Sequence, residues 1–372
     1  MAQFQPFDLE RIQSAWEQQV EYNLSESGAH PIRAIDLLPE ANEQRAFLER
    51  TLYYPEVNGT ALLRERIAAL YPHAGSQNVL VTVGCIEANA ISLLTLMQPG
   101  DEAVVMVPNY LQTWGLIHNL GFVRREIHLR EEHGWAPDLN ELEANVNERT
   151  RVIAICNPNN PTGRILTEQE MDHIVRIAGR AGAWILADET YRGAERTQDE
   201  MSTSFWGKYD RVLATGSLSK AYGLPGIRVG WVLAPADQVE ALWMRHEYFT
   251  ISAGLLDMAL AEKALAPGMR ESINRRTREY IRRGYPRLQN WVESHAGVLS
   301  LVPPQASAVA FLRCRLPVST ATLSDRLIKE KSVLVVPGEC FGIPDHLRIS
   351  FGLPDEVLTP ALQRIDELLA SL

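Results

Sequence analysis

The stretch Thr215-Gly-Ser-Leu-Ser-Lys-Ala-Tyr-Gly-Leu-Pro-Gly-Ile-Arg-Val-Gly-Trp231 brings a serine, a lysine and an arginine close together along the chain. Ser217, Lys220 and Arg228 fall within twelve residues, and three glycines surround the arginine. Glycine lets the backbone wrap closely around a small ligand. The apolar run Val212–Ala214 leads into the stretch and is typical of a strand buried on both faces of a parallel sheet.

The same rhythm of apolar run, turn and helix precedes this stretch. The apolar runs are Val79–Val83, Ala103–Val107, Val152–Cys156, Trp184–Ala187 and Val212–Ala214. Their residues are nearly all apolar rather than alternating, as in strands that helices cover on both faces. Val229–Leu233 is expected to be a further strand, for which an antiparallel direction fits. We predict a large, mainly parallel-sheet α/β domain over residues 45–255.

The remaining chain mixes helical and strand patterns. A long helical stretch, Leu255–Val292, is interrupted near Pro267, and Phe7–Val20 has the spacing of an amphipathic helix. Short strands are expected at Ala308–Leu312, Val333–Val336 and Leu347–Ser350. We predict a smaller α+β domain built from residues 1–44 and 256–372.

The composition excludes several classes of protein. The 372 residues carry a net charge of −10, which argues against nucleic acid as a main partner because phosphate binding needs a basic face. The four cysteines form no C-x-x-C pair, so neither a zinc site nor a disulfide framework is indicated. We see no signal peptide and no apolar run long enough to span a membrane. A cytoplasmic location is expected.

Polar or aromatic side chains follow the apolar runs, at the strand ends where parallel sheets bind ligands. They are Cys85 and Ile86 at a helix start, Tyr110, Asn160, Asp188 and Tyr191. Free N–H groups at a helix start suit a phosphate, although each signal is weak alone. With Ser217, Lys220 and Arg228 they form one set: a lysine for an imine, an acid, ring contacts and phosphate ligands. This is the set needed to hold pyridoxal 5′-phosphate (PLP).

From about Tyr54 to Arg348, the order of these motifs resembles that of the class I/II aminotransferases, the fold-type I PLP-dependent enzymes. The signature Ser-Leu-Ser-Lys-Ala-Tyr-Gly-Leu-Pro-Gly-Ile-Arg-Val-Gly carries most of the likeness, with Asn-Pro-Thr-Gly and Asp-Glu-Thr-Tyr before it. The resemblance implies a homodimer in which Tyr54 reaches the phosphate of the neighbouring subunit's cofactor.

The resemblance also implies a role for each matched residue. Lys220 would form the imine with PLP and move the substrate's Cα proton, while Asp188 would pair with the pyridine nitrogen. Arg348, in Leu-Arg-Ile-Ser-Phe-Gly, would bind the substrate α-carboxylate through two parallel hydrogen bonds. The other implied cofactor ligands are Ser217, Arg228 and the backbone of Cys85 and Ile86 for the phosphate, Tyr110 for ring stacking, and Asn160 and Tyr191 for O3′.

The N-terminal substrate loop departs from the family pattern. The family usually has Leu-x-x-Gly-x-Pro, whereas this chain has Leu24-Ser-Glu-Ser-Gly-Ala-His-Pro31. The loop is faintly similar to the capreomycidine-synthase branch, which acts on arginine-derived amino acids. We expect Glu26 and Ser27, with Asn160, to contact the substrate, and Glu26 to meet a cationic side chain. A solvated loop carboxylate is the alternative for Glu26.

Three functions fit these observations to different degrees. The first is a PLP-dependent aminotransferase that moves the amino group of an α-amino acid to a 2-oxo acid. The second keeps PLP but performs elimination, replacement, cyclisation or oxidation of an amino acid. The third is a regulator with an aminotransferase-like sensor, which the short segment before Tyr54 and the negative charge disfavour. The S-x-x-K pattern of serine acylases lacks its companion K-T-G motif here.

Overall fold

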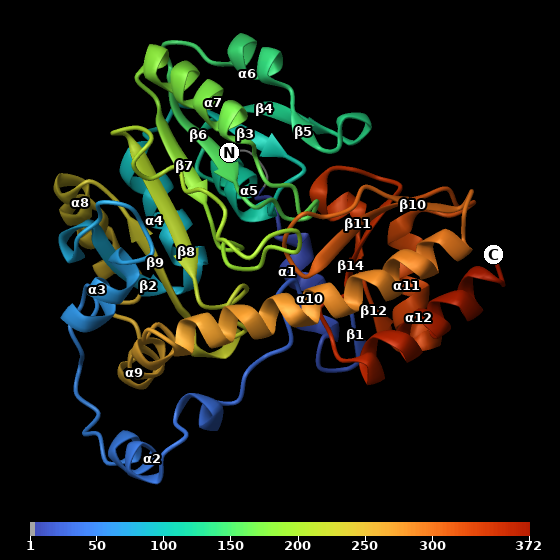
Figure 1. Cartoon of the computed structure of the whole chain (residues 1–372). Helices are drawn as coiled ribbons and strands as arrows, with labels where there is room; N and C mark the ends of the chain where they lie inside the picture. Colours follow the sequence, from blue (N-terminus) through green and yellow to red (C-terminus); the bar gives the residue numbers. More distant parts are fainter. Residues whose placement is uncertain (1–3) are drawn as a thin grey trace.

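The computed structural model describes residues 4–372 and contains two principal sheets (Figure 1). The larger sheet has the strand order β2-β9-β8-β7-β6-β3-β4-β5. Its strands are β2 (Val79–Val83), β3 (Glu102–Val107), β4 (Val123–Arg130), β5 (Ala136–Pro137), β6 (Thr150–Cys156), β7 (Trp184–Asp188), β8 (Val212–Ser217) and β9 (Val229–Leu233). β3 pairs in parallel with β4 and β6, and β7 pairs in parallel with β6 and β8. β9 is antiparallel to both neighbours, which confirms the direction that its sequence favoured.

Each apolar strand contributes to two cores because alternate side chains point to opposite faces. Along β3, Val104 and Met106 enter one cluster, while Ala103 and Val105 enter the other. The helices that cover the sheet are α3 (Ala61–Ala68), α4 (Gly84–Leu96), α5 (Leu111–Asn119), α6 (Leu139–Asn145), α7 (Glu168–Ala181), α8 (Ala236–Phe249) and α9 (Leu255–Ala264). Residues of α3 and α7 fill the first cluster and residues of α4, α5 and α8 fill the second. This double coverage explains the near-continuous apolar runs.

The smaller sheet has the order β10-β11-β14-β13, and β1 pairs with β12 beside it. These strands are β1 (Tyr22–Asn23), β10 (Leu299–Leu301), β11 (Val309–Cys314), β12 (Val333–Leu334), β13 (Val336–Pro337) and β14 (His346–Ser350). The expectation of one strand over Val333–Val336 is wrong. The strand is interrupted at Val335, and its two halves pair with β1 and with β14. The domain limits at residues 45 and 255 stay a prediction.

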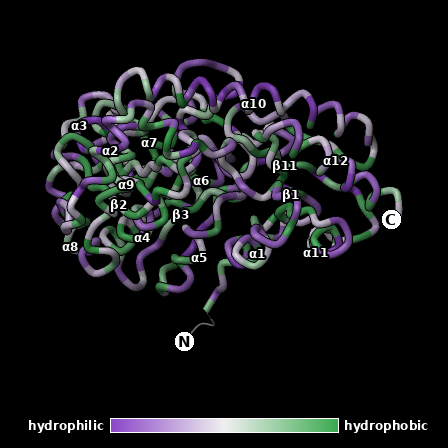
Figure 2. Tube along the Cα trace, turned by 90° about the horizontal axis from the view of Figure 1, so that it is seen from below, coloured by the Kyte–Doolittle hydropathy of each residue, from purple (hydrophilic) through white to green (hydrophobic). Residues whose placement is uncertain are grey.

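The helices that belong with the smaller sheet are α1 (Asp8–Trp16), α10 (Met269–Ser294), α11 (Thr320–Lys331) and α12 (Asp355–Leu369). The break expected near Pro267 is confirmed between α9 and α10, where Gly268 has φ +81°. α1 is shorter than the predicted Phe7–Val20, because the chain must turn after it to enter β1. The charged helix α10 is largely purple and white in Figure 2 and lies at the surface.

Three local features complete the fold. α2 (Ala41–Leu48) stands apart from both sheets at the lower left of Figure 1. The cysteines Cys85, Cys156, Cys314 and Cys340 are all free. Within residues 4–372, no helix combines the length and the apolar character needed to cross a membrane.

Candidate active site

A cleft lies where α1 meets the larger sheet and β14 of the smaller sheet. Every side chain predicted for the site lines this cleft except Tyr54. These are Glu26, Ser27, Cys85, Ile86, Tyr110, Asn160, Asp188, Tyr191, Ser217, Lys220, Arg228 and Arg348. The larger sheet and its loops supply most of them, β14 supplies Arg348, and the segment after β1 supplies Glu26 and Ser27.

One end of the cleft is shaped for an anion by Arg228 and the beginning of α4. Gly84, the first residue of α4, has φ +74°, and a Cβ there would lie 2.5 Å from Arg228 Nη2. Glycine is therefore needed for this close approach. Arg228 Nη1 donates to the carbonyl oxygen of Pro225 at 3.0 Å and lies 3.4 Å from Ser219 Oγ. No side chain caps the start of α4 among the described residues, and Cys85 and Ile86 in its first turn line the cleft.

Hydroxyl groups complete this anion pocket. Ser217 Oγ lies 3.2 Å from Thr190 Oγ1 and accepts a hydrogen bond from Ser219 N at 3.3 Å. A guanidinium, a helix start and several hydroxyls together suit a phosphate group. Thr190 and Ser219 were missed in the sequence analysis, although both lie inside the motifs that it used.

Asp188 is held at the end of β7 by three hydrogen bonds. Asn89 Nδ2 donates to Oδ2 at 2.9 Å, and Thr190 N and Cys85 Sγ donate to Oδ1 at 3.1 and 3.7 Å. Burial raises the pKa of Asp188, and the hydrogen bonds from Asn89 and Thr190 oppose that rise. A buried carboxylate without a cationic partner is costly, so this site favours a ligand that brings a positive charge. A protonated pyridine nitrogen meets that need.

Asn89 was also missed, and its role makes a first testable prediction. Its side chain bridges Asp188 and Thr215 Oγ1, which donates to Asn89 Oδ1 at 2.7 Å. We expect Asn89→Leu to weaken PLP binding roughly tenfold or more, because a hydrogen bond to a charged group contributes about 1.5–3 kcal/mol. A titration of PLP absorbance measures the change. Ser92→Ala is the matched control, since Ser92 is buried on the same helix and its hydroxyl donates to Ala88 O, with no bond to Asp188 within residues 4–372. Equal affinities in both variants would contradict this role.

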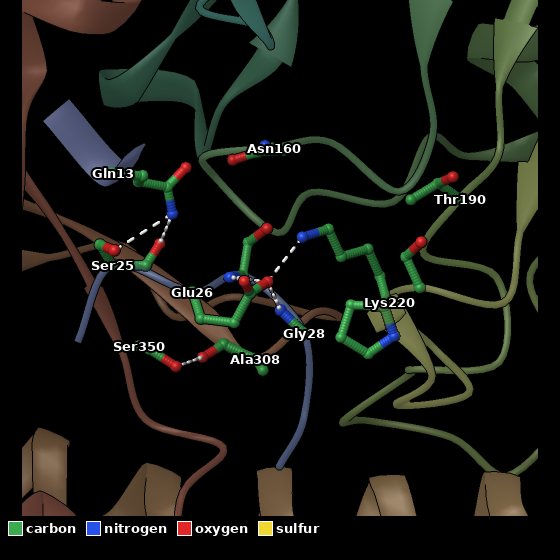
Figure 3. Close-up of polar contacts among 12 residues, drawn as sticks. Gln13, Ser25, Glu26, Gly28, Asn160, Thr190, Lys220, Ala308 and Ser350 are labelled. Atoms are coloured by element: carbon green, nitrogen blue, oxygen red, sulfur yellow. Dashed lines mark hydrogen bonds and ion pairs between the residues drawn. The ribbon is translucent and has the colours of Figure 1, made fainter. Parts of the chain in front are cut away.

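Lys220 lies opposite the segment that follows β1, and its amine forms an ion pair with a carboxylate there. Lys220 Nζ donates to Glu26 Oε1 at 2.6 Å (Figure 3). The same oxygen accepts hydrogen bonds from Ser27 N at 2.9 Å and Gly28 N at 3.2 Å. The positive charge of Lys220 is the main cause that lowers the pKa of Glu26 to about 2. The Glu26 carboxyl is therefore ionised at neutral pH.

Arg348 lies at the other end of the cleft, with only 1% of its surface exposed. Its Nη1 donates to Asn160 Oδ1 at 3.0 Å and its Nη2 to Ser25 O at 2.5 Å. Its Nε is buried and finds no acceptor within residues 4–372. A buried guanidinium with an unused donor is suited to a ligand carboxylate. Tyr191 OH, which donates to Ser27 Oγ at 2.9 Å, ties the nearby loop in place.

The wall formed by α1 is polar, and the sequence analysis missed it. Tyr110 OH donates to Glu10 Oε1 at 2.6 Å, and Gln13 Nε2 donates to both oxygens of Ser25 at 3.1 Å. The Glu17 carboxylate has neither a hydrogen bond nor an ion pair within the described range. Burial, followed by the charges of Glu26 and Glu10, raises the pKa of Glu17. The spacing 10, 13, 17 marks one helical face, but nothing in the sequence tells which cavity that face lines.

Tyr54 lies elsewhere and is 87% exposed. Leu48, Leu52 and Tyr53 beside it are also exposed, so this segment forms an apolar arm on the surface. The predicted contact of Tyr54 with a neighbouring subunit's cofactor stays a prediction.

Comparison with known proteins gives concordant results. Residues 21–365 match the model of the family "Aminotransferase class I and II". Capreomycidine synthase from Streptomyces vinaceus is 32% identical over 84% of this chain and 80% of its own length. An aspartate aminotransferase from Streptomyces avermitilis is 30% identical over 85% and 81% of the two chains. The structure of a PLP-dependent aminotransferase from Streptococcus suis superposes with a TM-score of 0.93 at 28% identity, covering 99% of this chain and 98% of that one.

Proposed function

Because this chain belongs to the aminotransferase class I and II family of PLP-dependent enzymes, we propose that it moves the amino group of an α-amino acid to a 2-oxo acid. The observation that carries the proposal is the shared cleft of Lys220, Asp188 and Arg348. When bound there, PLP supplies an electron sink for the negative charge that develops at the substrate's Cα.

The residues present fit PLP in charge and in hydrogen-bonding capacity. Arg228, Ser217 and the N–H groups of Cys85 and Ile86 would hold the phosphate, and Asp188 would hold the ring nitrogen. The remaining proposed contacts are Asn160 and Tyr191 to O3′ and Tyr110 to the ring face. The glycine at position 84 and the orphan Nε of Arg348 support this fit, because both leave room or bonding capacity that a ligand would use.

Lys220 and Arg348 would then act on the substrate from opposite ends of the cleft. Arg348 would bind the α-carboxylate and fix the orientation of the Cα–H bond, with Asn160 holding the guanidinium in place. Lys220 Nζ would take the Cα proton and return it at a different atom, which is general acid–base catalysis. Orientation by a bidentate arginine reduces the entropy that the reaction step must lose.

An amino-acid screen tests the proposal. The purified protein with PLP is given single amino acids, each with and without a 2-oxo acid acceptor. We expect a new keto acid to appear only when the acceptor is present. Release of ammonia or peroxide without an acceptor would instead identify a lyase or an oxidase, and a ring product formed without either would identify a cyclase.

A second candidate, a PLP enzyme for an amino acid with a cationic side chain, is favoured by the charges of α1. Most charges in the loaded cleft would have a partner of opposite sign. Arg228 would pair with the phosphate, and Arg348 with the substrate carboxylate. Asp188 would pair with the protonated ring nitrogen, and Glu26 pairs with Lys220. Within the described residues, neither Glu10 nor Glu17 forms an ion pair. Burial, followed by the charges of Glu26 and Glu10, raises the pKa of Glu17, and the charge of Lys220 opposes this rise. A second positive charge on the substrate would relieve this repulsion. Transamination, elimination, cyclisation and oxidation are all open to such a substrate.

We expect Glu17→Gln to lower kcat/KM for arginine or lysine about tenfold, because one hydrogen bond to a partly exposed charge is lost. The value for alanine should change less than about twofold, since alanine cannot reach Glu17. Steady-state kinetics with the three amino acids measure this difference. An equal loss with all three would contradict a cationic substrate.

The exposed arm at Leu48–Tyr54 supports a homodimer, because an apolar arm of this kind marks an interaction surface. In that assembly Tyr54 would reach the neighbouring cofactor phosphate. The cytoplasmic location expected from the sequence stays a prediction.

A further inference from the structure

We propose that Glu26 is the counter-charge of Lys220, which holds Lys220 Nζ while this nitrogen carries a proton and thereby strengthens Lys220 as a base. This inference rests on the proposed function and assigns a further residue to the same site. It differs from the expectation that Glu26 contacts the substrate side chain, because the structure directs the carboxylate to Lys220.

The contact itself is short and well supported. Glu26 Oε1 lies 2.6 Å from Lys220 Nζ, and the two residues belong to segments 194 residues apart. The N–H groups of Ser27 and Gly28 fix the same oxygen (Figure 3). Both side chains are partly shielded from water, with 25% and 30% exposure for Lys220 and Glu26. A charge-assisted hydrogen bond of this kind is stronger than a neutral one.

The loop that carries Glu26 is clamped on both sides. Leu24 N donates to Leu334 O at 2.8 Å, and Leu24 O accepts from Ser350 N at 2.8 Å. Further along, His30 N donates to Gly352 O at 3.1 Å. The carboxylate is therefore presented by a fixed segment rather than by a free loop.

Gly28 sets this segment directly against the backbone of the lysine. A Cβ at position 28 would lie 3.2 Å from Ser219 O and 3.4 Å from Lys220 Cα. The absence of a side chain at this position allows the close approach that brings Glu26 within reach of Nζ.

The proton balance of the reaction explains why a carboxylate is useful here. Lys220 begins as a neutral amine, takes one proton from the substrate's Cα and becomes an ammonium, while the C–H electron pair stays on the substrate. Glu26 remains ionised throughout and stabilises the ammonium. Return of the proton from Nζ regenerates the amine, so no proton is gained or lost.

Other charged groups face the same space and must be considered in any pH experiment. They are Glu10 and Glu17 from α1, Asp188 from β7, Arg228 from the loop before β9 and Arg348 from β14. Within the described residues, Lys220 Nζ forms its ion pair with Glu26 and with none of these other groups. Glu17 is the best comparison, because it is a carboxylate on the adjacent wall.

The first measurement requires no turnover. Cofactor-free wild type and Glu26→Gln are mixed with PLP over a pH series, and absorbance gives the rate of covalent association, which requires an unprotonated amine. Glutamine keeps the oxygen that accepts from Ser27 N and Gly28 N but lacks the charge. We expect the rate profile of Glu26→Gln to lie about one pH unit lower, with roughly tenfold faster association at a given pH below the plateau.

The second measurement follows exchange of the substrate's Cα hydrogen for solvent deuterium by NMR, in the PLP-loaded protein without an acceptor. We expect Glu26→Gln to exchange about tenfold more slowly and Glu26→Asp to recover part of the loss. Faster association together with slower exchange is a pair of changes in opposite directions, which a merely misfolded or loosened loop would not produce.

In the association measurement, where no substrate is present, Glu17→Gln provides the control for the general field of the cleft. Coincident profiles of wild type and Glu26→Gln, or an equal shift in Glu17→Gln, would overturn the inference. The association experiment is independent of transamination, so a protein that attaches PLP but moves no amino group still tests Glu26. Failure of wild type to attach PLP at all would instead reject the proposed function, and with it the role given to Glu26.

Discussion

Replacement of Lys220 with alanine is expected to abolish covalent attachment of PLP and to lower the rate of amino-group transfer by roughly 10⁴-fold or more. Two separate contributions are lost, because the same amine is proposed to bond to the cofactor and to move the Cα proton. Absorbance spectra with added PLP and single-turnover kinetics measure the two losses separately.

Lys208→Ala is the control for this experiment. Lys208 forms ion pairs with Glu168 and Asp172 and does not line the cleft. We expect this variant to attach PLP and to transfer amino groups like the wild type. A Lys220→Ala protein that still shows the spectrum of covalently attached PLP would place the attachment on another lysine and would reject the proposed site.

The second large effect is expected at Arg348. We predict that Arg348→Ala lowers kcat/KM for the preferred amino acid by roughly 30- to 5,000-fold, because truncation of one partner of a buried charged pair costs about 2–5 kcal/mol. Arg348→Lys should recover only part of this loss, since an ammonium cannot form two parallel bonds to a carboxylate. Attachment of PLP should be unaffected in both variants.

A substrate comparison separates carboxylate recognition from damage to the fold. The corresponding amine, which lacks the α-carboxylate, is tested with wild type and with each variant. We expect Arg348 variants to lose activity with the amino acid but not with the amine, so that the preference for the amino acid falls. An unchanged preference would show that Arg348 does not bind the carboxylate, whatever the loss of activity. Thermal unfolding checks whether the loss of the bonds to Ser25 O and Asn160 Oδ1 destabilises the protein.

The buried strands of the larger sheet could be predicted because they are apolar on both faces. β4 was missed, since its first half is exposed and carries Arg124, Arg125 and Glu126. An edge-side strand of this kind lacks the continuous apolar run on which the prediction depended. The split of Val333–Val336 into β12 and β13 was not predicted either, because all four residues are apolar and buried, so the sequence does not mark the point at which the chain changes its pairing partner.

The residues of the cleft also divide into those that a sequence pattern could predict and those that it could not. Asp188 and Asn160 could be predicted from the sequence because Asp188 lies at the end of a recognisable strand and Asn160 lies in the turn after another. Lys220 could be predicted because its surroundings form a specific motif. Glu17 lies on α1, and the sequence of this helix does not show which cavity it lines, because that depends on how the whole chain folds. The bond between Glu26 and Lys220 joins two distant segments, and neither segment's own pattern encodes the other.

The clamped N-terminal segment has a consequence for the order in which a newly made chain becomes an enzyme. Ser25 O receives its hydrogen bond from Arg348, 323 residues later, and Tyr22 pairs with Val333. The ribosome completes β9 long before it reaches Arg348, by an interval on the order of ten seconds at ordinary rates of synthesis. If the larger sheet folds in that interval, Lys220 is in place while the N-terminal segment still lacks its partners Val333 and Arg348. A ribosome-bound chain stalled before β14 would therefore hold the groups for the cofactor but not the arginine for the substrate.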